Sequence, residues 1–118
     1  MQFGLRVIHL VESLPNSQTA RVIGNQLLRA GTAVGANYRS ALRGRSRADF
    51  VAKMGIVEEE CDEALYWMQM LIDSNLVKKS RLTELMNEAN EISAIVVSSI
   101  KTARTRSNSP KSGFRNQK

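Results

Sequence analysis

Apolar residues recur with one unbroken rhythm through the middle of this 118-residue chain. The spacing alternates between four and three residues along one stretch: Phe50, Met54, Val57, Cys61, Ala64, Met68 and Leu71. Residues three or four positions apart lie on the same side of an α-helix, whereas successive residues of a strand alternate between faces. The pattern therefore predicts a long amphipathic helix whose apolar stripe packs in the core of a helical bundle.

Three further stretches show helical spacing. We expect helices at about residues 2–14, 18–43 and 80–104, besides the central helix that begins after Ser46 and ends near residues 73–75. Ser17 and Ser46 are expected N-caps, and Pro15 ends the first helix. The other core stripes are Phe3, Val7, Leu10 or Val11, and Leu14; Ile23, Leu27, Ala30, Val34 and Ala41; and Leu82, Leu85, Ala89, Ile92, Val96 and Ala103. Short connections predict an all-α protein, an antiparallel up-down-up-down four-helix bundle over residues 1–106.

The short first helix leaves its neighbours partly uncovered in this arrangement. The second and third helices are expected to project beyond it or to expose part of their apolar faces. Gly24, Gly31 and Gly35 form a second stripe on the helix at 18–43. Each glycine costs a helix about 1 kcal/mol relative to alanine. Either another helix approaches closely at this stripe, or the helix is locally weak or kinked.

Positive charge gathers in two places. The chain carries 17 basic and 11 acidic residues, a net charge of +6, and residues 101–118 hold six of the basic residues and no acid. Residues 107–118 are polar and are expected to form a disordered basic tail. The second concentration is "SALRGRSRAD" at residues 40–49, where three arginines fall within five positions. Such asymmetry points to an anionic partner or to a solubilising tail.

The arginines have two interpretations. Arginine bridges phosphate oxygens in pairs, and the start of a helix adds unpaired N–H groups, so the turn between the second and third helices could bind nucleic acid. The candidate nucleic-acid-binding residues are Arg39, Arg43, Arg45, Arg47, Lys53, Lys101, Arg104 and Arg106. Alternatively, the carboxylates at residues 58–63 pair with these arginines within one chain or between subunits.

No residue pattern indicates catalysis, a metal or a cofactor. The carboxylates at residues 58–63 lack the Glu-x-x-His motif of carboxylate metal bundles, and the single His9 lies far away in sequence. Phosphate-loop, nucleophile-elbow and triad patterns are absent. Cys61 stands alone on the core stripe, which predicts a small apolar residue in a reducing, cytoplasmic protein. Neither a signal peptide nor a membrane-spanning run is visible in the sequence.

A few polar and aromatic residues leave alternatives open. Asn37 lies where an apolar residue is expected; it could line a binding pocket or fix helix register through a buried hydrogen bond with Glu59 or Glu63. Tyr38, Tyr66, Trp67 and Phe114 could stack on bases, although core or interface packing is the simpler role for the first three. Ile95 and Val97 widen the last apolar stripe, a hint of self-association.

The run "GTAVGANYRSALRGRSRADFVAKMGIVEEECDEALYWMQML" resembles the small four-helix-bundle proteins known as 23S rRNA intervening-sequence proteins. The resemblance covers about residues 14–100. Its marks are Gln26 and Leu27, Ala36 to Arg39, Ser46, Phe50 and Lys53, Glu59 and Glu63, and Tyr66 and Trp67. Some relatives carry Glu-Gly shortly after the matching asparagine, where this chain has Ser40 and Ala41, so it fits a more basic branch.

The resemblance implies a homo-oligomer, in relatives a ring-shaped pentamer. Some relatives are encoded within inserts of ribosomal RNA genes, and others are accessory proteins of diversity-generating retroelements that bind nucleic acid and a reverse transcriptase. The sequence leaves open which role applies. We expect a non-catalytic, oligomeric accessory protein that binds RNA or DNA mainly through phosphates and with little sequence preference. The alternative is a protein-interaction scaffold with no nucleic-acid role.

Overall fold

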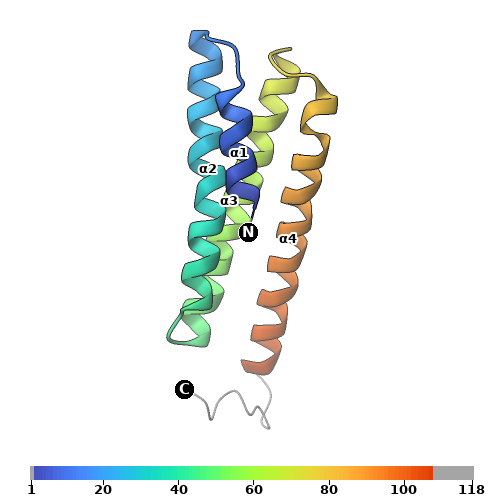
Figure 1. Ribbon diagram of the computed structural model, residues 1–118. Coiled ribbons are helices and arrows are strands. Elements are labelled where there is room, and N and C mark those ends of the chain that lie inside the picture. Colours follow the sequence, from blue (N-terminus) through green and yellow to red (C-terminus); the bar gives the residue numbers. More distant parts are fainter. Residues whose placement is uncertain (1, 108–118) are drawn as a thin grey trace.

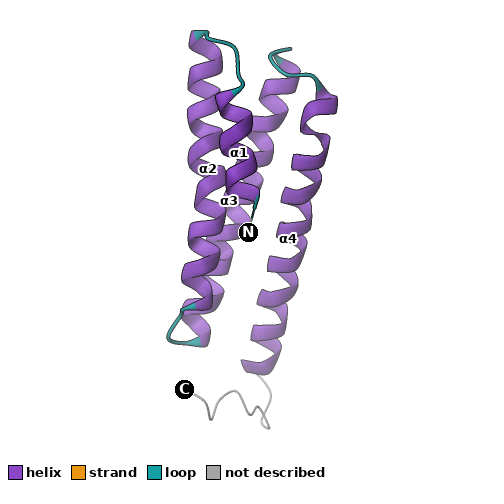
Figure 2. Ribbon diagram, in the orientation of Figure 1, coloured by secondary structure: helices purple, strands orange, loops and turns teal. Residues whose placement is uncertain are grey.

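Four α-helices make up the bundle in the computed structural model, which describes residues 2–107. They are α1 (Phe3–Glu12), α2 (Gln18–Leu42), α3 (Arg47–Asp73) and α4 (Lys79–Ser107). No strand occurs among the described residues (Figure 2). The helices lie side by side in a rod of 56 × 20 × 18 Å. The predicted all-α class and the up-down-up-down four-helix bundle are confirmed.

The order of the helices places two distant segments at one end of the rod. The α2–α3 turn and the C-terminal end of α4 lie at the lower end in Figure 1, whereas the α1–α2 and α3–α4 turns lie at the upper end. Helix α3 packs along both α2 and α4, and α1 packs mainly against α2. Residues 39–57 and 95–107 therefore meet at the lower end, although they are far apart in the sequence.

Side-chain hydrogen bonds cap the start of α2 and of α3 where the sequence predicts. The Ser17 side chain accepts a hydrogen bond from the Ala20 N–H at 3.2 Å, and the Ser46 side chain accepts one from the Asp49 N–H at 3.0 Å. These bonds satisfy N–H groups that lack partners within the first turn of α2 and α3. At the end of α3, Asn75 takes a φ of 63°, a left-handed conformation that asparagine tolerates.

The core follows the predicted stripes closely. Six of the seven residues that define the rhythm in α3 are fully buried, at 0% exposure. The partly exposed residues of the predicted stripes are Val11, Leu14, Ile23, Phe50 and Ile92. Phe50 lies nearest the lower end, where fewer helices surround α3. The bundle is thus built from apolar stripes repeated every three or four residues, and among residues 2–107 fewer helices surround its lower end.

Close packing of α1 on α2 explains two of the three stripe glycines. A Cβ atom at Gly31 would lie 2.7 Å from Cγ1 of Val7, and one at Gly24 would lie 3.4 Å from Cγ1 of Val11 in α1 and 3.0 Å from Cδ1 of Leu14, which follows α1. Gly35, one turn beyond Gly31, has nothing within 4 Å of the same position. The predicted close approach therefore occurs at Gly24 and Gly31 and stops before Gly35, because α1 begins at Phe3 and reaches no further down α2.

Candidate nucleic-acid interface

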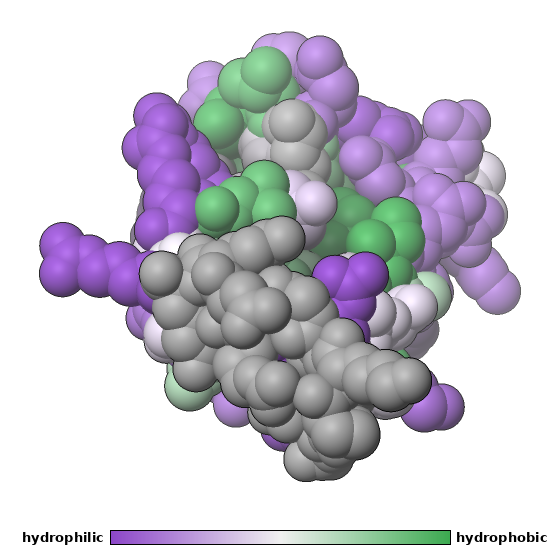
Figure 3. All heavy atoms as spheres, turned by 90° about the horizontal axis from the view of Figure 1, so that it is seen from below, coloured by the Kyte–Doolittle hydropathy of each residue, from purple (hydrophilic) through white to green (hydrophobic). Residues whose placement is uncertain are grey.

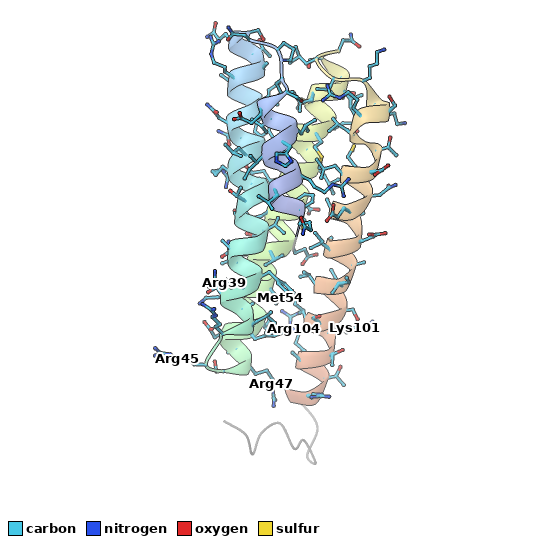
Figure 4. The ribbon with its side chains drawn as sticks, viewed as in Figure 1. Arg39, Arg45, Arg47, Met54, Lys101 and Arg104 are labelled. Atoms are coloured by element: carbon cyan, nitrogen blue, oxygen red, sulfur yellow. The ribbon has the colours of Figure 1, made fainter. Side chains whose placement is uncertain are left out.

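All eight candidate binding residues lie near the lower end of the rod. Arg39 comes from the last turn of α2, Arg43 and Arg45 from the connection that follows, and Arg47 and Lys53 from the first turns of α3. Lys101, Arg104 and Arg106 come from the last two turns of α4. Figure 4 shows both groups at the same end of the bundle. We call this surface, made by the eight residues, the basic end.

Charge is segregated along the rod. Residues 39–57 and 95–107, which form the lower end, hold eight basic residues and one acid, Asp49, and the next residue, Glu58, lines a hollow with Lys101 and Arg104. The remaining described residues hold six basic and ten acidic residues. The positive potential is therefore concentrated at one end, while the rest of the bundle is net negative. Figure 3 views this end along the axis, with hydrophilic side chains around the rim and apolar ones between them.

Most residues of the basic end have no carboxylate partner among residues 2–107. Among the described residues, the only ion pair formed by one of the eight candidates joins Lys53 Nζ to Asp49 Oδ1 at 3.7 Å, one turn apart on α3. Arg47 is partly buried and lies on the wall between α3 and α4. The remaining six form no ion pair with another described residue: Arg39, Arg43, Arg45, Lys101, Arg104 and Arg106.

Shallow hollows surround the lower part of α4, and basic side chains stand in their walls. One of about 460 Å³ is lined by Lys101 and Arg104 together with Glu58. Another, of about 300 Å³, lies between Arg47 and Arg104. A further one, of about 380 Å³, includes Arg106 and Phe50. These hollows are open to solvent, so an anionic ligand could reach the guanidinium and ammonium groups.

The carboxylates of α3 pair with an arginine outside the basic end. Arg29 of α2 forms ion pairs with Glu60, at 3.2 Å, and with Glu63. The Glu63 carboxylate also accepts a hydrogen bond from the Trp67 indole N–H at 3.3 Å. These two hydrogen bonds, from Trp67 and from Arg29, lower the pKa of Glu63. The acidic cluster at residues 58–63 thus serves partly to join α3 to α2.

A second set of ion pairs attaches α1 to α4. Arg6 lies 3.6 Å from Glu84 and also pairs with Glu88. Among residues 2–107, no three His, Cys, Asp or Glu side chains are grouped in a way that could hold a metal ion. Salt bridges between helices therefore account for several of the carboxylates, and all of these pairs lie outside the basic end.

The predicted hydrogen-bond partner of Asn37, Glu59 or Glu63, is wrong. Its side-chain amide donates a hydrogen bond to the Ala33 carbonyl at 2.9 Å, within α2, rather than bonding to Glu59 or Glu63. Asn37 is only partly buried, so it need not find a partner on another helix. Of the aromatic candidates, Tyr38 and Trp67 pack against the core, and Tyr66 is 54% exposed. Phe114 and residues 108–118 of the predicted tail lie outside the described residues.

Sequence reasoning missed four residues that line the 380 Å³ hollow. The apolar rhythm predicts Phe50 as a core residue, and no sequence pattern assigns Ser98, Ser99 or Thr102 to a site. The expected lengths of the helices could have indicated this hollow, because Phe50 is the first residue of its stripe and lies beyond the reach of the short α1.

No helix among residues 2–107 has the length and apolar content needed to cross a bilayer.

Comparison with known proteins agrees with this architecture. A search of curated proteins finds no match. A solved structure from Bacteroides thetaiotaomicron, described as a protein with unknown function from the S23 ribosomal protein family, is similar to this chain with a TM-score of 0.80. The two are 36% identical over 85% of this chain and 93% of that one. The family model of the 23S rRNA-intervening sequence protein matches residues 1–98. Since the fold, the sequence pattern and the family model agree, this chain belongs to the 23S rRNA-intervening sequence protein family.

Proposed function

We propose that the protein is a non-catalytic accessory protein that binds RNA or DNA at its basic end, mainly through phosphates and with little sequence preference. The observation that carries the proposal is the convergence of two basic segments on one end, where eight basic residues face only two nearby carboxylates, Asp49 and Glu58. Unpaired guanidinium groups can each bridge two phosphate oxygens. When these groups neutralise phosphates, the nucleic acid releases its condensed counterions, so binding would be strong at low salt and weak at high salt.

Helix dipoles also favour some of these residues, so charge alone does not prove a binding role. Arg39, Arg104 and Arg106 lie in the last turns of α2 and α4, where a positive charge stabilises a helix by about 0.3–1 kcal/mol. Arg45 lies outside any helix, and Lys101 lies before the last turn of α4. Their position has no such structural explanation, and it supports an external anionic partner.

Self-association is part of the proposal. Ile95 and Val97 of α4 are 58% and 45% exposed, which supports an apolar contact between copies. A homo-oligomer, a pentamer as the resemblance implies, would repeat the basic end once per subunit. Repetition makes weak phosphate contacts effective together. The lone buried cysteine fits a reducing, cytoplasmic setting.

Salt-titrated fluorescence anisotropy with short labelled RNA and DNA tests the proposal. Replacing both Arg43 and Arg45 with alanine should weaken binding and lower the slope of log affinity against log salt by about 0.7–0.9 for each phosphate that the variant no longer neutralises. The matched control replaces Lys78 and Lys79, two exposed basic residues at the opposite end, with alanine and should leave the slope unchanged. Equal losses in both variants, or no binding at low salt, would contradict the proposal and favour the protein-interaction scaffold.

A further inference from the structure

Within residues 2–107, the lower half of the bundle lacks a fourth helix. Gly4 lies in the first turn of α1, and a Cβ atom on it would lie 3.9 Å from the backbone of Gly31 and Thr32. The N-terminal end of α1 therefore lies beside the middle of α2. Helix α2 continues to Leu42, and α3 and α4 accompany it to the basic end (Figure 1). Gly35, on the face that α1 would cover if it were longer, faces open space. Phe50, at the start of the α3 stripe, is for the same reason only partly buried.

The 380 Å³ hollow lies between α3 and α4 at this less covered level. Its lining residues are Phe50 from α3 and, from α4, the small Ala103, the basic Arg106 and three hydroxyl residues, Ser98, Ser99 and Thr102. Its volume is within the range of small-molecule sites in proteins. The hollow thus combines an aromatic ring, hydroxyl groups that donate and accept hydrogen bonds, and one positive charge.

The hydroxyl groups in this hollow are not used by the helix. Elsewhere on the helices, Thr32, Thr83 and Thr105 each donate a hydrogen bond to the carbonyl four residues earlier. The side chains of Ser98, Ser99 and Thr102 form no such bond with any residue in the range 2–107. Arg106 likewise has no ion pair there. These polar groups are therefore available to a ligand.

We propose that this hollow takes an unpaired nucleobase, so that the basic end prefers single-stranded over double-stranded nucleic acid. The inference rests on the proposed function. The base would stack on Phe50, its edge would meet the hydroxyl groups of Ser99 and Thr102, and Arg106 would contact an adjacent phosphate. A paired base inside a duplex cannot enter such a hollow, because its faces are already stacked and its edge is already paired.

Stacking on Phe50 agrees with weak sequence preference. Every base has a flat aromatic face, so stacking tolerates all four bases while still rejecting a duplex. Phosphate contacts alone would bind both forms and would favour the duplex, because its charge density is higher. One stacked base should reverse that order and favour the single strand by about five- to hundredfold.

Anisotropy with three probes of equal length tests the proposal: a labelled single-stranded RNA, the same strand annealed to its complement, and an abasic strand that keeps the phosphates. The wild-type chain should bind the single strand at least about fivefold tighter than the other two. Phe50→Leu keeps an apolar side chain but removes the ring, so it should lower single-strand affinity to the abasic level and leave duplex affinity unchanged. Phe50→Tyr keeps the ring and should retain the preference.

The outcomes separate this inference from the proposed function. Equal wild-type affinity for single strand and duplex would overturn the base-binding hollow and leave phosphate binding intact. An equal loss of both affinities in Phe50→Leu, with an altered circular dichroism spectrum, would assign Phe50 a structural role and overturn it too. A changed subunit number in Phe50→Leu by light scattering would overturn it as well, by showing that a second copy covers the hollow. Absence of binding to every probe would instead contradict the proposed function itself.

Discussion

Cys61 shows how the core controls the chemistry of a single residue. It lies midway along α3, completely buried among apolar neighbours. Burial disfavours the charged thiolate, and the nearby carboxylates of Asp62, Glu58 and Glu60 disfavour it further, which together raise the pKa of Cys61 to about 11. The thiol therefore stays protonated at neutral pH and behaves as a small apolar side chain rather than a nucleophile.

The raised pKa of Cys61 predicts a loss of stability at high pH. An unfolded thiol has a pKa near 8.5, so between about pH 8.5 and 11 the unfolded chain releases a proton that the folded chain keeps. The free energy of unfolding should fall over this window, by up to about 1.4 kcal/mol per pH unit for this group. Urea denaturation of the wild type and of Cys61→Ala, between pH 7 and 11, should show a steeper fall for the wild type. Parallel curves would contradict the prediction.

The surroundings of Asn37 and Phe50 could not be predicted from the sequence. Their periodicity places both near the inward face, but periodicity carries no information about how far a neighbouring helix extends. Asn37 donates its amide hydrogen bond within α2. Phe50 borders a hollow at the level of the bundle where, among the described residues, α1 does not reach. Burial at such positions depends on the length of a different element, which residue patterns do not encode locally.

The contact between α1 and α2 gives a prediction at the scale of the element. Gly31→Ala would place a Cβ atom 2.7–2.8 Å from both Cγ atoms of the β-branched Val7, so α1 must shift and the protein should lose about 1–3 kcal/mol of stability. Gly35→Ala on the same helix meets nothing within 4 Å and should add about 0.5–1 kcal/mol through helix propensity. Thermal or urea unfolding of the two variants measures the difference, and changes of the same sign in both would exclude this packing.

Helix boundaries were predictable to the extent that side chains specify them. Ser17 and Ser46 cap α2 and α3 as expected, because a serine oxygen before an amphipathic stretch satisfies a free N–H group. The end of α4 was less well defined: the helix was expected to stop near Arg104 but continues to Ser107. Neither glycine nor proline lies between Arg104 and Ser107, and the nearest stop signal in the sequence, Pro110, comes three residues after Ser107, so the sequence favours an end later than Arg104.

At the scale of the whole molecule, topology makes the basic end. The sequence shows two basic segments, and the expected up-down-up-down order brings the α2–α3 turn and the end of α4 together, so their convergence was predictable. The ion pairs were not predictable from the sequence, because the carboxylates of residues 58–63 could have faced either Arg29 or the arginines of the basic end. In the structure Glu60 and Glu63 pair with Arg29, and six residues of the basic end form no ion pair with another described residue: Arg39, Arg43, Arg45, Lys101, Arg104 and Arg106. Like charges gathered in this way repel one another and oppose folding, although they suit an anionic partner.

Arg45 and Arg29 provide a matched test of this division between binding and stability. Arg45→Gln removes a charge from the basic end, where Arg45 has no ion pair with a described residue. The free energy of unfolding should stay within about 0.5 kcal/mol of the wild type, or rise at low salt. The affinity for nucleic acid should fall. Arg29→Gln removes the partner of Glu60 and Glu63, and should lower stability but spare affinity. Added salt screens both effects and should bring the two variants closer together. Urea unfolding and anisotropy at low and at high salt measure the four values; a clear loss of stability in Arg45→Gln would mean that the arginines of the basic end hold the fold together, whether within a chain or between subunits.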